Sequence, residues 1–187
     1  VQANNPIITG AGIVQVISIA QTDSLIDPNS PSFPLTFRIT ENNSYDVRTN
    51  VALLASKNYE RICTLTDTAA YGQGMLQSIT STFEQYGLTI WESVQHAVNA
   101  TDLTGQALKL RDSGCDAVYL ASLGADAALF LKTVKQLGWD VNGLGARGLA
   151  TSSFILSAGA DADGIEFPST LDPSRPVISN DGWEHPD

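Results

Sequence analysis

From Arg61 onward, short apolar runs alternate with longer amphipathic stretches along the chain. The runs that predict β-strands cover residues 61–66, 88–94, 116–122, 141–145 and 164–167. Between them, apolar residues recur every three to four positions, which is the period of a helix with one buried face. Strands that alternate with helices are typical of a parallel sheet. The pattern therefore predicts an α/β fold.

Two of the predicted helices carry their apolar residues on one stripe. The first stripe contains Met75, Leu76, Ile79, Phe83 and Tyr86, and the second contains Ala127, Phe130, Leu131, Val134 and Leu137. Gly87, Gly114 and Gly138 directly follow the three main helices, where a left-handed cap favours a residue without a Cβ atom. Together with an earlier helix at 45–56 and right-handed crossovers, this order predicts a doubly wound, Rossmann-like sheet in three α/β/α layers.

The first forty residues follow a different pattern. One β-rich run, GIVQVISIA (12–20), precedes the proline- and serine-rich stretch SLIDPNSPSFP and then LTFRI. The run has no partner strand of its own in the repeat, and an unpaired strand edge favours pairing with another chain. We therefore expect a longer parent molecule to supply the rest of this sheet, and we expect dimerisation or strand exchange of the chain alone.

Composition excludes several classes of partner. The 187 residues are 43% apolar and carry a formal charge of −10, whereas nucleic acids and anionic lipid surfaces select basic proteins. No uninterrupted apolar run reaches the ~20 residues that cross a bilayer. The N-terminus lacks the basic and apolar regions of a signal peptide. We expect a soluble chain, processed or excised, with no nucleic-acid partner and no direct membrane insertion.

Two cysteines, Cys63 and Cys115, are too few for a disulfide scaffold and lack metal-ligand spacing. We expect two buried thiols. A disulfide stays open as the alternative, because both residues lie near strands that could be neighbours and an extracytoplasmic compartment would allow the bond.

Ligands of open parallel sheets bind beyond the carboxyl ends of the strands, which selects the loops 67–74, 96–102, 123–126 and 146–152. The segment TDTAAYGQGM places hydroxyls and glycines at a helix start, but without a Walker lysine or a GxGxxG fingerprint a simple turn is favoured over a phosphate loop. His96 and His185 have no obvious serine or cysteine partner, so we expect a solvated surface role for both. No catalytic residue, metal or cofactor is expected.

Arg147 and Tyr71 are the two side chains in these loops with a specific ligand-binding interpretation. Arg147 follows a strand end and precedes a helix start, where its guanidinium could bind a carboxylate with two hydrogen bonds. A surface arginine paired with an acid of this acidic chain is the equally weighted alternative. Tyr71 could stack on a ligand or donate to it, or simply close the local turn.

Four stretches carry a family resemblance. They are VISIAQTDSLIDPNSPSFPLTFRI, LTDTAAYGQGMLQSITSTFEQYG, DLTGQALKLRDSGCDAVYLASLGADAALFLKTVKQLGW and LGARGLATSSFILSAGADADGIEF. In this order, over most of residues 12–168, the chain resembles the leucine/isoleucine/valine-binding family of ABC-transporter periplasmic substrate-binding proteins. The resemblance implies two α/β lobes that close on a ligand by hinge motion, and a periplasmic or extracytoplasmic location with a lipid anchor possible in the full-length protein.

The resemblance also divides the chain. Residues 1–32 correspond to the end of the first lobe with its linker, 33–42 to a crossover or hinge, 43–168 to the second ligand-binding lobe, and 169–187 to a return linker or tail. It implies an amino acid or related small carboxylate as ligand and an ABC permease as partner. A ligand-sensing domain of a receptor or signalling protein is the alternative, and a small flavodoxin-like enzyme or carrier is a third class.

The ligand residues implied by the family come from both lobes. Ala20, Gln21 and Thr22 match the first-lobe turn that holds the ligand α-carboxylate, and Tyr71 matches the aromatic residue after the first strand of the second lobe. Leu123 stands about where the family often has an aromatic side chain. Arg147 stands where amino-acid binders commonly have an acid for the α-ammonium. Since an arginine repels an ammonium, we expect a second anionic group on the ligand, as in a dicarboxylate, or an aromatic acid.

Overall fold

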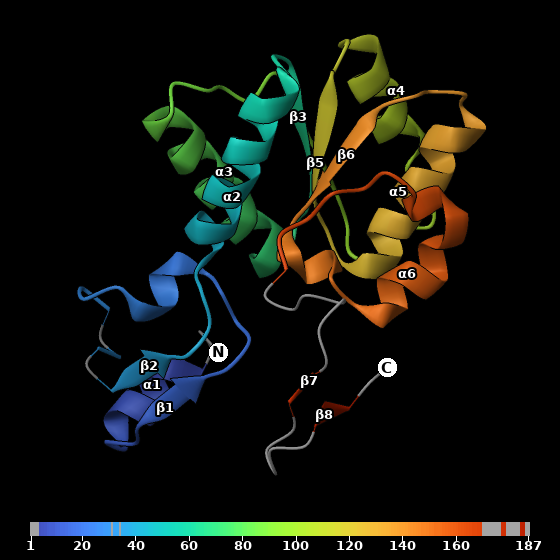
Figure 1. Ribbon diagram of the computed structural model, residues 1–187. Helices are drawn as coiled ribbons and strands as arrows, with labels where there is room; N and C mark the ends of the chain where they lie inside the picture. Colours follow the sequence, from blue (N-terminus) through green and yellow to red (C-terminus); the bar gives the residue numbers. More distant parts are fainter. Residues whose placement is uncertain (1–3, 31, 34, 170–176, 179–183, 186–187) are drawn as a thin grey trace.

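The computed structural model describes residues 4–30, 32–33, 35–169, 177–178 and 184–185. Its main body is a four-stranded parallel sheet in the order β4-β3-β5-β6 (Figure 1). The strands are β3 (Ile62–Asp67), β4 (Ser93–His96), β5 (Ala117–Ala121) and β6 (Asn142–Gly145). The central strands β3 and β5 are buried along their whole length, as expected for a sheet covered on both faces. The predicted α/β fold is confirmed.

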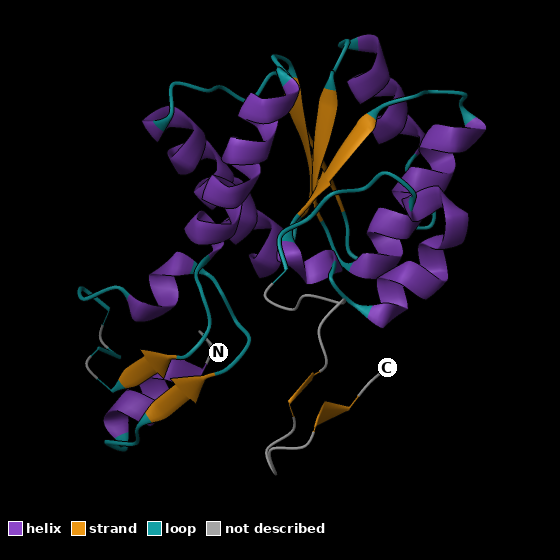
Figure 2. Ribbon diagram, viewed as in Figure 1, coloured by secondary structure: helices purple, strands orange, loops and turns teal. Residues whose placement is uncertain are grey.

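Helices cover both faces of this sheet (Figure 2). On one face lie α2 (Asn43–Lys57) and α3 (Ala70–Gln85), and on the other lie α4 (Thr104–Asp112), α5 (Gly124–Gln136) and α6 (Ser152–Ala158). Each face has its own core. One contains Val47, Leu54, Met75, Ile79 and Phe83, and the other contains Leu110, Ala127, Phe130, Val134 and Phe154. The predicted apolar stripes thus form the two cores, except that Leu76 belongs to neither core and Tyr86 is 54% exposed.

Three of the predicted strands are confirmed, and two are not where the pattern put them. The apolar run at 88–94 begins with Leu88 and Ile90, which pack against the α2–α3 core before the ladder starts, so β4 covers residues 93–96 instead. Residues 164–167 form no strand but a single parallel bridge between Leu144 and Glu166. Apolar burial alone therefore does not locate a strand, since a loop that packs on a core carries the same signal.

The N-terminal segment forms a separate small layer. It contains α1 (Asn5–Gly10), β1 (Gln15–Ile17), a 3-10 helix η2 (Asp23–Ile26) and β2 (Thr36–Arg38). The expectation that the 12–20 run has no partner strand in the chain is wrong, because β1 pairs with β2 in parallel register from Gln15 and Thr36 onward. The pairing follows from the proline-rich loop between the runs, which returns the chain beside β1. At the C-terminus, β7 (Val177–Ile178) and β8 (Glu184–His185) pair antiparallel.

Apolar side chains of this small layer are exposed. Val16, Ile19, Phe37 and Ile39 have 61%, 82%, 54% and 75% of their surface accessible. A two-stranded sheet lacks a second layer to bury such residues. The layer therefore retains an uncovered apolar face.

The predicted helix stops are confirmed. Gly87, Gly114 and Gly138 have φ angles of 70°, 77° and 61°, in the left-handed region that favours glycine. Among the described residues, no helix is long and apolar enough to span a membrane.

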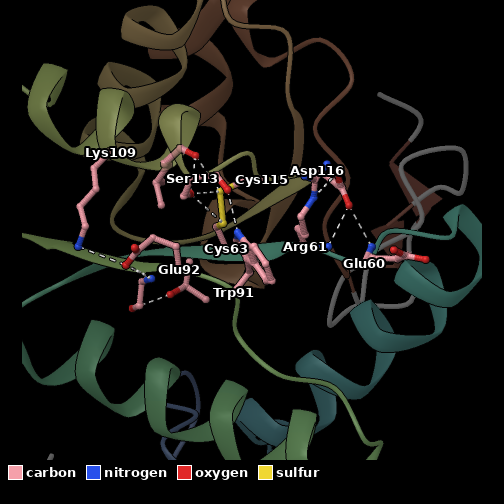
Figure 3. The surroundings of a disulfide bond; sticks show 12 residues. Glu60, Arg61, Cys63, Trp91, Glu92, Lys109, Ser113, Cys115 and Asp116 are labelled. Carbon is pink, nitrogen blue, oxygen red and sulfur yellow. Dashed lines mark hydrogen bonds and ion pairs between the residues drawn. A yellow bond between two sulfur atoms is a disulfide. The ribbon is translucent and has the colours of Figure 1, made fainter.

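A disulfide joins Cys63 and Cys115, so the expectation of two free thiols is wrong (Figure 3). Cys63 lies in β3 and Cys115 lies just before β5, and these two strands are direct neighbours with Ile62 opposite Ala117. Strand pairing thus holds the two Cα atoms 5.9 Å apart, within the range that a disulfide needs. The indole of Trp91 donates to the Ser113 carbonyl beside the bond.

We expect reduction of this disulfide to lower the free energy of unfolding by about 3–4 kcal/mol, because the bond closes a loop that spans 52 positions and restricts the unfolded chain. Urea unfolding with and without a reductant measures the difference. The Cys63→Ala, Cys115→Ala double variant is the control and must not respond to the reductant. Equal stability of the oxidised and reduced wild type would contradict this role.

Candidate functional site

The carboxyl ends of the sheet strands lie on the side where the N-terminal segment joins the main body (Figure 1). Three segments meet there. They are the turn after β1, the chain that leads from β2 into α2, and the 3-10 helix η3 (Arg147–Leu149) after β6. Ligands of parallel α/β sheets bind at this edge, so it is the candidate binding site.

Arg147 lies at this edge, between two carboxylates. Its Nη1 atom donates to Glu41, and its Nε atom lies 3.3 Å from Asp46 Oδ2. The Arg147 side chain is 13% exposed and that of Asp46 is 4% exposed. Gln21 completes the group, since its amide donates to Asp46 Oδ2 over 3.3 Å. We call these four residues the Arg147 cluster.

The ionisation of the two acids differs because their surroundings differ. Burial raises the pKa of Asp46 to about 6, and Arg147 only partly offsets the effect. The hydrogen bond from Arg147 lowers the pKa of the Glu41 carboxyl, which is close to solvent. The cluster therefore holds one carboxylate that stays ionised and one that gains a proton just below neutral pH.

The turn that contains Gln21 is fixed through its backbone. The guanidinium of Arg38 donates to the carbonyl oxygens of Gln21 and Thr22 over 3.1 and 3.0 Å. The backbone N–H of Asn43, in the first turn of α2, also donates to Gln21 O over 2.9 Å. These contacts hold the Gln21 turn of the N-terminal segment against Arg38 and the start of α2.

Tyr71 reaches the cluster from the first turn of α3. A Cβ atom at Gly148 would lie 2.5 Å from the Tyr71 hydroxyl, so the ring contacts the η3 backbone directly after Arg147. Burial raises the pKa of this hydroxyl above its usual range. Among the described residues, neither the buried Tyr71 hydroxyl nor the buried Nη2 atom of Arg147 has a well-formed hydrogen bond. Two donors are thus left without an acceptor.

The other three predicted site residues are not members of the cluster. Ala20 is half-buried before the Gln21 turn, and Leu123 is 46% exposed at the start of α5. Thr22 packs its methyl group toward Gly74 and lines a polar cavity of about 390 Å³ together with Asp23, Ser44 and Ser78. The structure therefore brings Gln21, Tyr71 and Arg147 together, and it does not bring Ala20, Thr22 or Leu123 into this cluster.

Sequence reasoning missed Glu41 and Asp46. Both lie before the first strand of the repeat, and the Arg147–Glu41 contact spans 106 positions. The sequence around Glu41 and Asp46 gives little indication that these acids belong to a site. Asn42 caps α2 by accepting from Tyr45 N, and an acid in the first turn of a helix is commonly explained by the helix dipole. An acid with that ordinary explanation does not predict a partner on a distant loop.

The expectation of a solvated His96 is wrong. The ring is 3% exposed, and its Nε2 atom lies 2.7 Å from Ser122 Oγ. Its Nδ1 atom lies 2.8 Å from the Ala97 carbonyl and 3.9 Å from Asp126 Oδ2. The order serine, histidine, aspartate resembles a catalytic triad, but Ser122 is completely buried and cannot reach a substrate. The side chain of His185 lies outside what the structure describes.

Asp126 and His96 instead organise the loop after β4. The Asp126 carboxylate accepts from the backbone N–H groups of Asn99 and Ala100, both over 3.0 Å. Buried polar groups that are fully paired make a chain segment rigid. Within the described part of the chain, no group of three or more His, Cys, Asp or Glu residues is arranged to hold a metal ion.

The β3–α3 turn is built around Asp67. Its Oδ1 atom accepts from the N–H groups of Ala69 and Gly72 over 2.9 and 3.3 Å. The carboxylate thus occupies the helix start that a phosphate loop would leave open for an anion. This arrangement supports the simple-turn interpretation of the segment, and it fixes the position of Tyr71.

A family model described as "Periplasmic binding protein" matches residues 1–178. The leucine-, isoleucine-, valine-, threonine- and alanine-binding protein of Pseudomonas aeruginosa is 30% identical over 106 residues, which cover 56% of this chain and 28% of that protein. The chain therefore spans less than a third of this curated relative.

Solved structures share the fold. A type 1 periplasmic binding protein from Bordetella pertussis superimposes with a TM-score of 0.80 at 21% identity, over 88% of this chain and 45% of that one. A branched-chain amino acid ABC transporter protein from Thermus thermophilus, solved with bound valine, gives 0.78 at 19% identity, over 88% and 42%. An extracellular ligand-binding receptor from Rhodopseudomonas palustris gives 0.79 at 22% identity, over 89% and 47%.

We expect Gly72→Ala to lower the free energy of unfolding by about 2 kcal/mol or more, because the added Cβ would lie 2.1 Å from the Asp67 backbone oxygen and force the turn apart. Denaturant unfolding measures the loss. Gly105→Ala, in the first turn of α4, is the matched control, since a Cβ there meets no atom within 4 Å. Equal effects of the two substitutions would show that the β3–α3 turn is not tightly packed.

Proposed function

Because the chain belongs to the periplasmic binding protein family, we propose that it is part of the extracytoplasmic solute-binding component of an ABC transporter. It contributes the second lobe and a segment of the first. The ligand is an amino acid or a related small carboxylate, bound between the two lobes. The Pseudomonas relative is named for five amino acids and the Thermus structure contains valine, which supports this ligand class.

The observation that carries the proposal is the Arg147 cluster. Gln21 comes from the N-terminal segment, Glu41 from the connection into α2, and Arg147 from the carboxyl edge of the sheet. Buried donors without an acceptor are rare in folded proteins, and Tyr71 Oη and Arg147 Nη2 are two such groups on adjoining elements.

Each predicted site residue has a role in this proposal. Ala20, Gln21 and Thr22 bind the ligand α-carboxylate through their turn, and Tyr71 donates to the ligand. Leu123 contributes apolar contact from the start of α5, where its side chain is accessible. Arg147 binds a second anionic group of the ligand, such as the distal carboxylate of a dicarboxylate, by donating hydrogen bonds to it.

The proposal includes a partner and a location. A binding protein of this family delivers its ligand to an ABC permease. The binding protein itself is located outside the cytoplasm. The Cys63–Cys115 disulfide supports that location, because such bonds persist in oxidising compartments. A lipid anchor on the full-length protein is part of the same proposal.

We expect small carboxylates to raise the melting temperature of the full-length protein, with both lobes present, in a thermal-shift panel of L-amino acids, aromatic acids and dicarboxylates. A ligand at a hundred times its Kd stabilises the native state by about 2.7 kcal/mol, a shift of several degrees. Arg147→Gln should reduce the shift, and Arg111→Gln on the exposed side of α4 is the matched control. No shift with any member of the panel would overturn the proposal.

A further inference from the structure

We propose that Asp46 takes up a proton when an anionic group of the ligand binds beside Arg147, so that this buried carboxyl couples ligand binding to pH. The inference rests on the proposed function, because it requires a ligand at the carboxyl edge of the sheet. It assigns Asp46 as a positioning residue that acts on the ligand through Arg147.

The charges of the cluster do not balance. Two carboxylates, Glu41 and Asp46, share the single guanidinium of Arg147. Glu41 is near solvent, with 38% of its side chain exposed, whereas Asp46 is 4% exposed. An extra negative charge is least tolerable at the more buried site, because the protein interior screens it poorly.

The other groups that face Asp46 do not neutralise it. Gln21 donates a neutral amide to the same Oδ2 atom that Arg147 approaches. Asp23 adds a further negative charge at longer range. The hydroxyls of Tyr71 and Tyr119 are neutral, and the charge of Asp46 helps to raise the pKa of both. Arg147 is therefore the cation on which the ionised form of Asp46 depends.

An anionic ligand would compete for that cation. The Nη2 atom of Arg147 is buried and has no partner among the described residues, while Nη1 and Nε already serve the two acids. A ligand carboxylate beside the part of the Arg147 side chain that stays exposed brings a third negative charge to one guanidinium. Protonation of Asp46 removes one of these three negative charges. The neutral carboxyl still has an oxygen that accepts the hydrogen bond from Gln21.

Asp46 titrates close enough to neutral pH for ligand binding to change its protonation. Burial places the pKa of Asp46 at about 6, so the free protein is mostly ionised there at neutral pH. A nearby anion raises this pKa further, and a group with a higher pKa in the complex than in the free protein gives tighter binding as the pH falls. If the ligand raises the pKa by one unit, affinity at pH 6 exceeds affinity at pH 8 by about fivefold.

The sign of the effect reports the charge of the ligand. An ammonium group beside Asp46 would lower its pKa and would release a proton, so binding would tighten as the pH rises. A neutral group would leave the pKa nearly unchanged. The direction of the pH dependence therefore separates the three ligand types at this corner.

Titration calorimetry of the full-length protein tests the inference with glutarate, benzoate and L-leucine as probes at pH 6 and pH 8. Runs at pH 6 in MES and in bis-Tris, which both buffer there and differ in ionisation enthalpy, give the number of protons taken up by the wild type without any substitution. Asp46→Asn removes the titrating group. Asp112→Asn, an exposed acid on α4, changes the net charge of the protein equally and serves as the control.

We expect glutarate or benzoate to bind about fivefold more tightly at pH 6 than at pH 8, with uptake of about 0.4 proton at pH 6, and Asp46→Asn but not Asp112→Asn to abolish both effects. Binding that tightens with rising pH, that takes up no proton, or that keeps its pH dependence in Asp46→Asn would overturn the inference and leave the proposed function standing. Absence of binding by all three probes at both pH values would overturn the ligand class itself, and the inference with it.

Discussion

The contact between Arg147 and the acids Glu41 and Asp46 is the interaction on which the candidate site depends. It joins the loop after the last sheet strand to the segment that leads from the small N-terminal layer into α2. A guanidinium with 13% of its side chain exposed is costly to bury unless carboxylates pair with it. The pairing therefore decides where η3 lies, and with it the position of Gly148 against Tyr71.

The parallel sheet makes this meeting possible. Every strand of the main sheet runs in the same direction, so the loops after β3, β4, β5 and β6 gather at one edge. The turn at Asp67 and the buried His96, Ser122 and Asp126 network hold two of these loops in place. The rigid edge then presents Arg147 and Asp46 to Glu41 and Gln21 of the N-terminal part of the chain.

Local periodicity was sufficient to predict most of the fold. The helical stripes, the glycine stops and the strands β3, β5 and β6 all follow from patterns within some fifteen residues. The errors arose where distant residues decide the outcome. The partner of β1 comes after a proline-rich loop, the disulfide depends on β3 and β5 being neighbours, and the buried His96 pairs with Ser122 in the loop after β5. None of these contacts leaves a periodic signal.

The site was predicted in part for the same reason. Arg147 and Tyr71 stand out because they follow strand ends, but Glu41 and Asp46 precede the repeat and look like ordinary acids near a helix start. Their presence changes the chemistry of the corner. An isolated arginine would offer its full charge to a ligand, whereas the Arg147 cluster carries an excess of negative charge that depends on the protonation of Asp46.

A double-mutant cycle between Arg147 and Asp46 tests most directly whether this pair organises the site. The free energy of unfolding would be measured at pH 8 for the wild type, Arg147→Met, Asp46→Asn and the double variant. We expect a coupling energy of about 1–3 kcal/mol, because Arg147→Met leaves the buried Asp46 carboxylate without a cation and the double variant removes that cost. Additive effects within about 0.3 kcal/mol would contradict the account, since Arg147 would then be held in place by something other than Asp46.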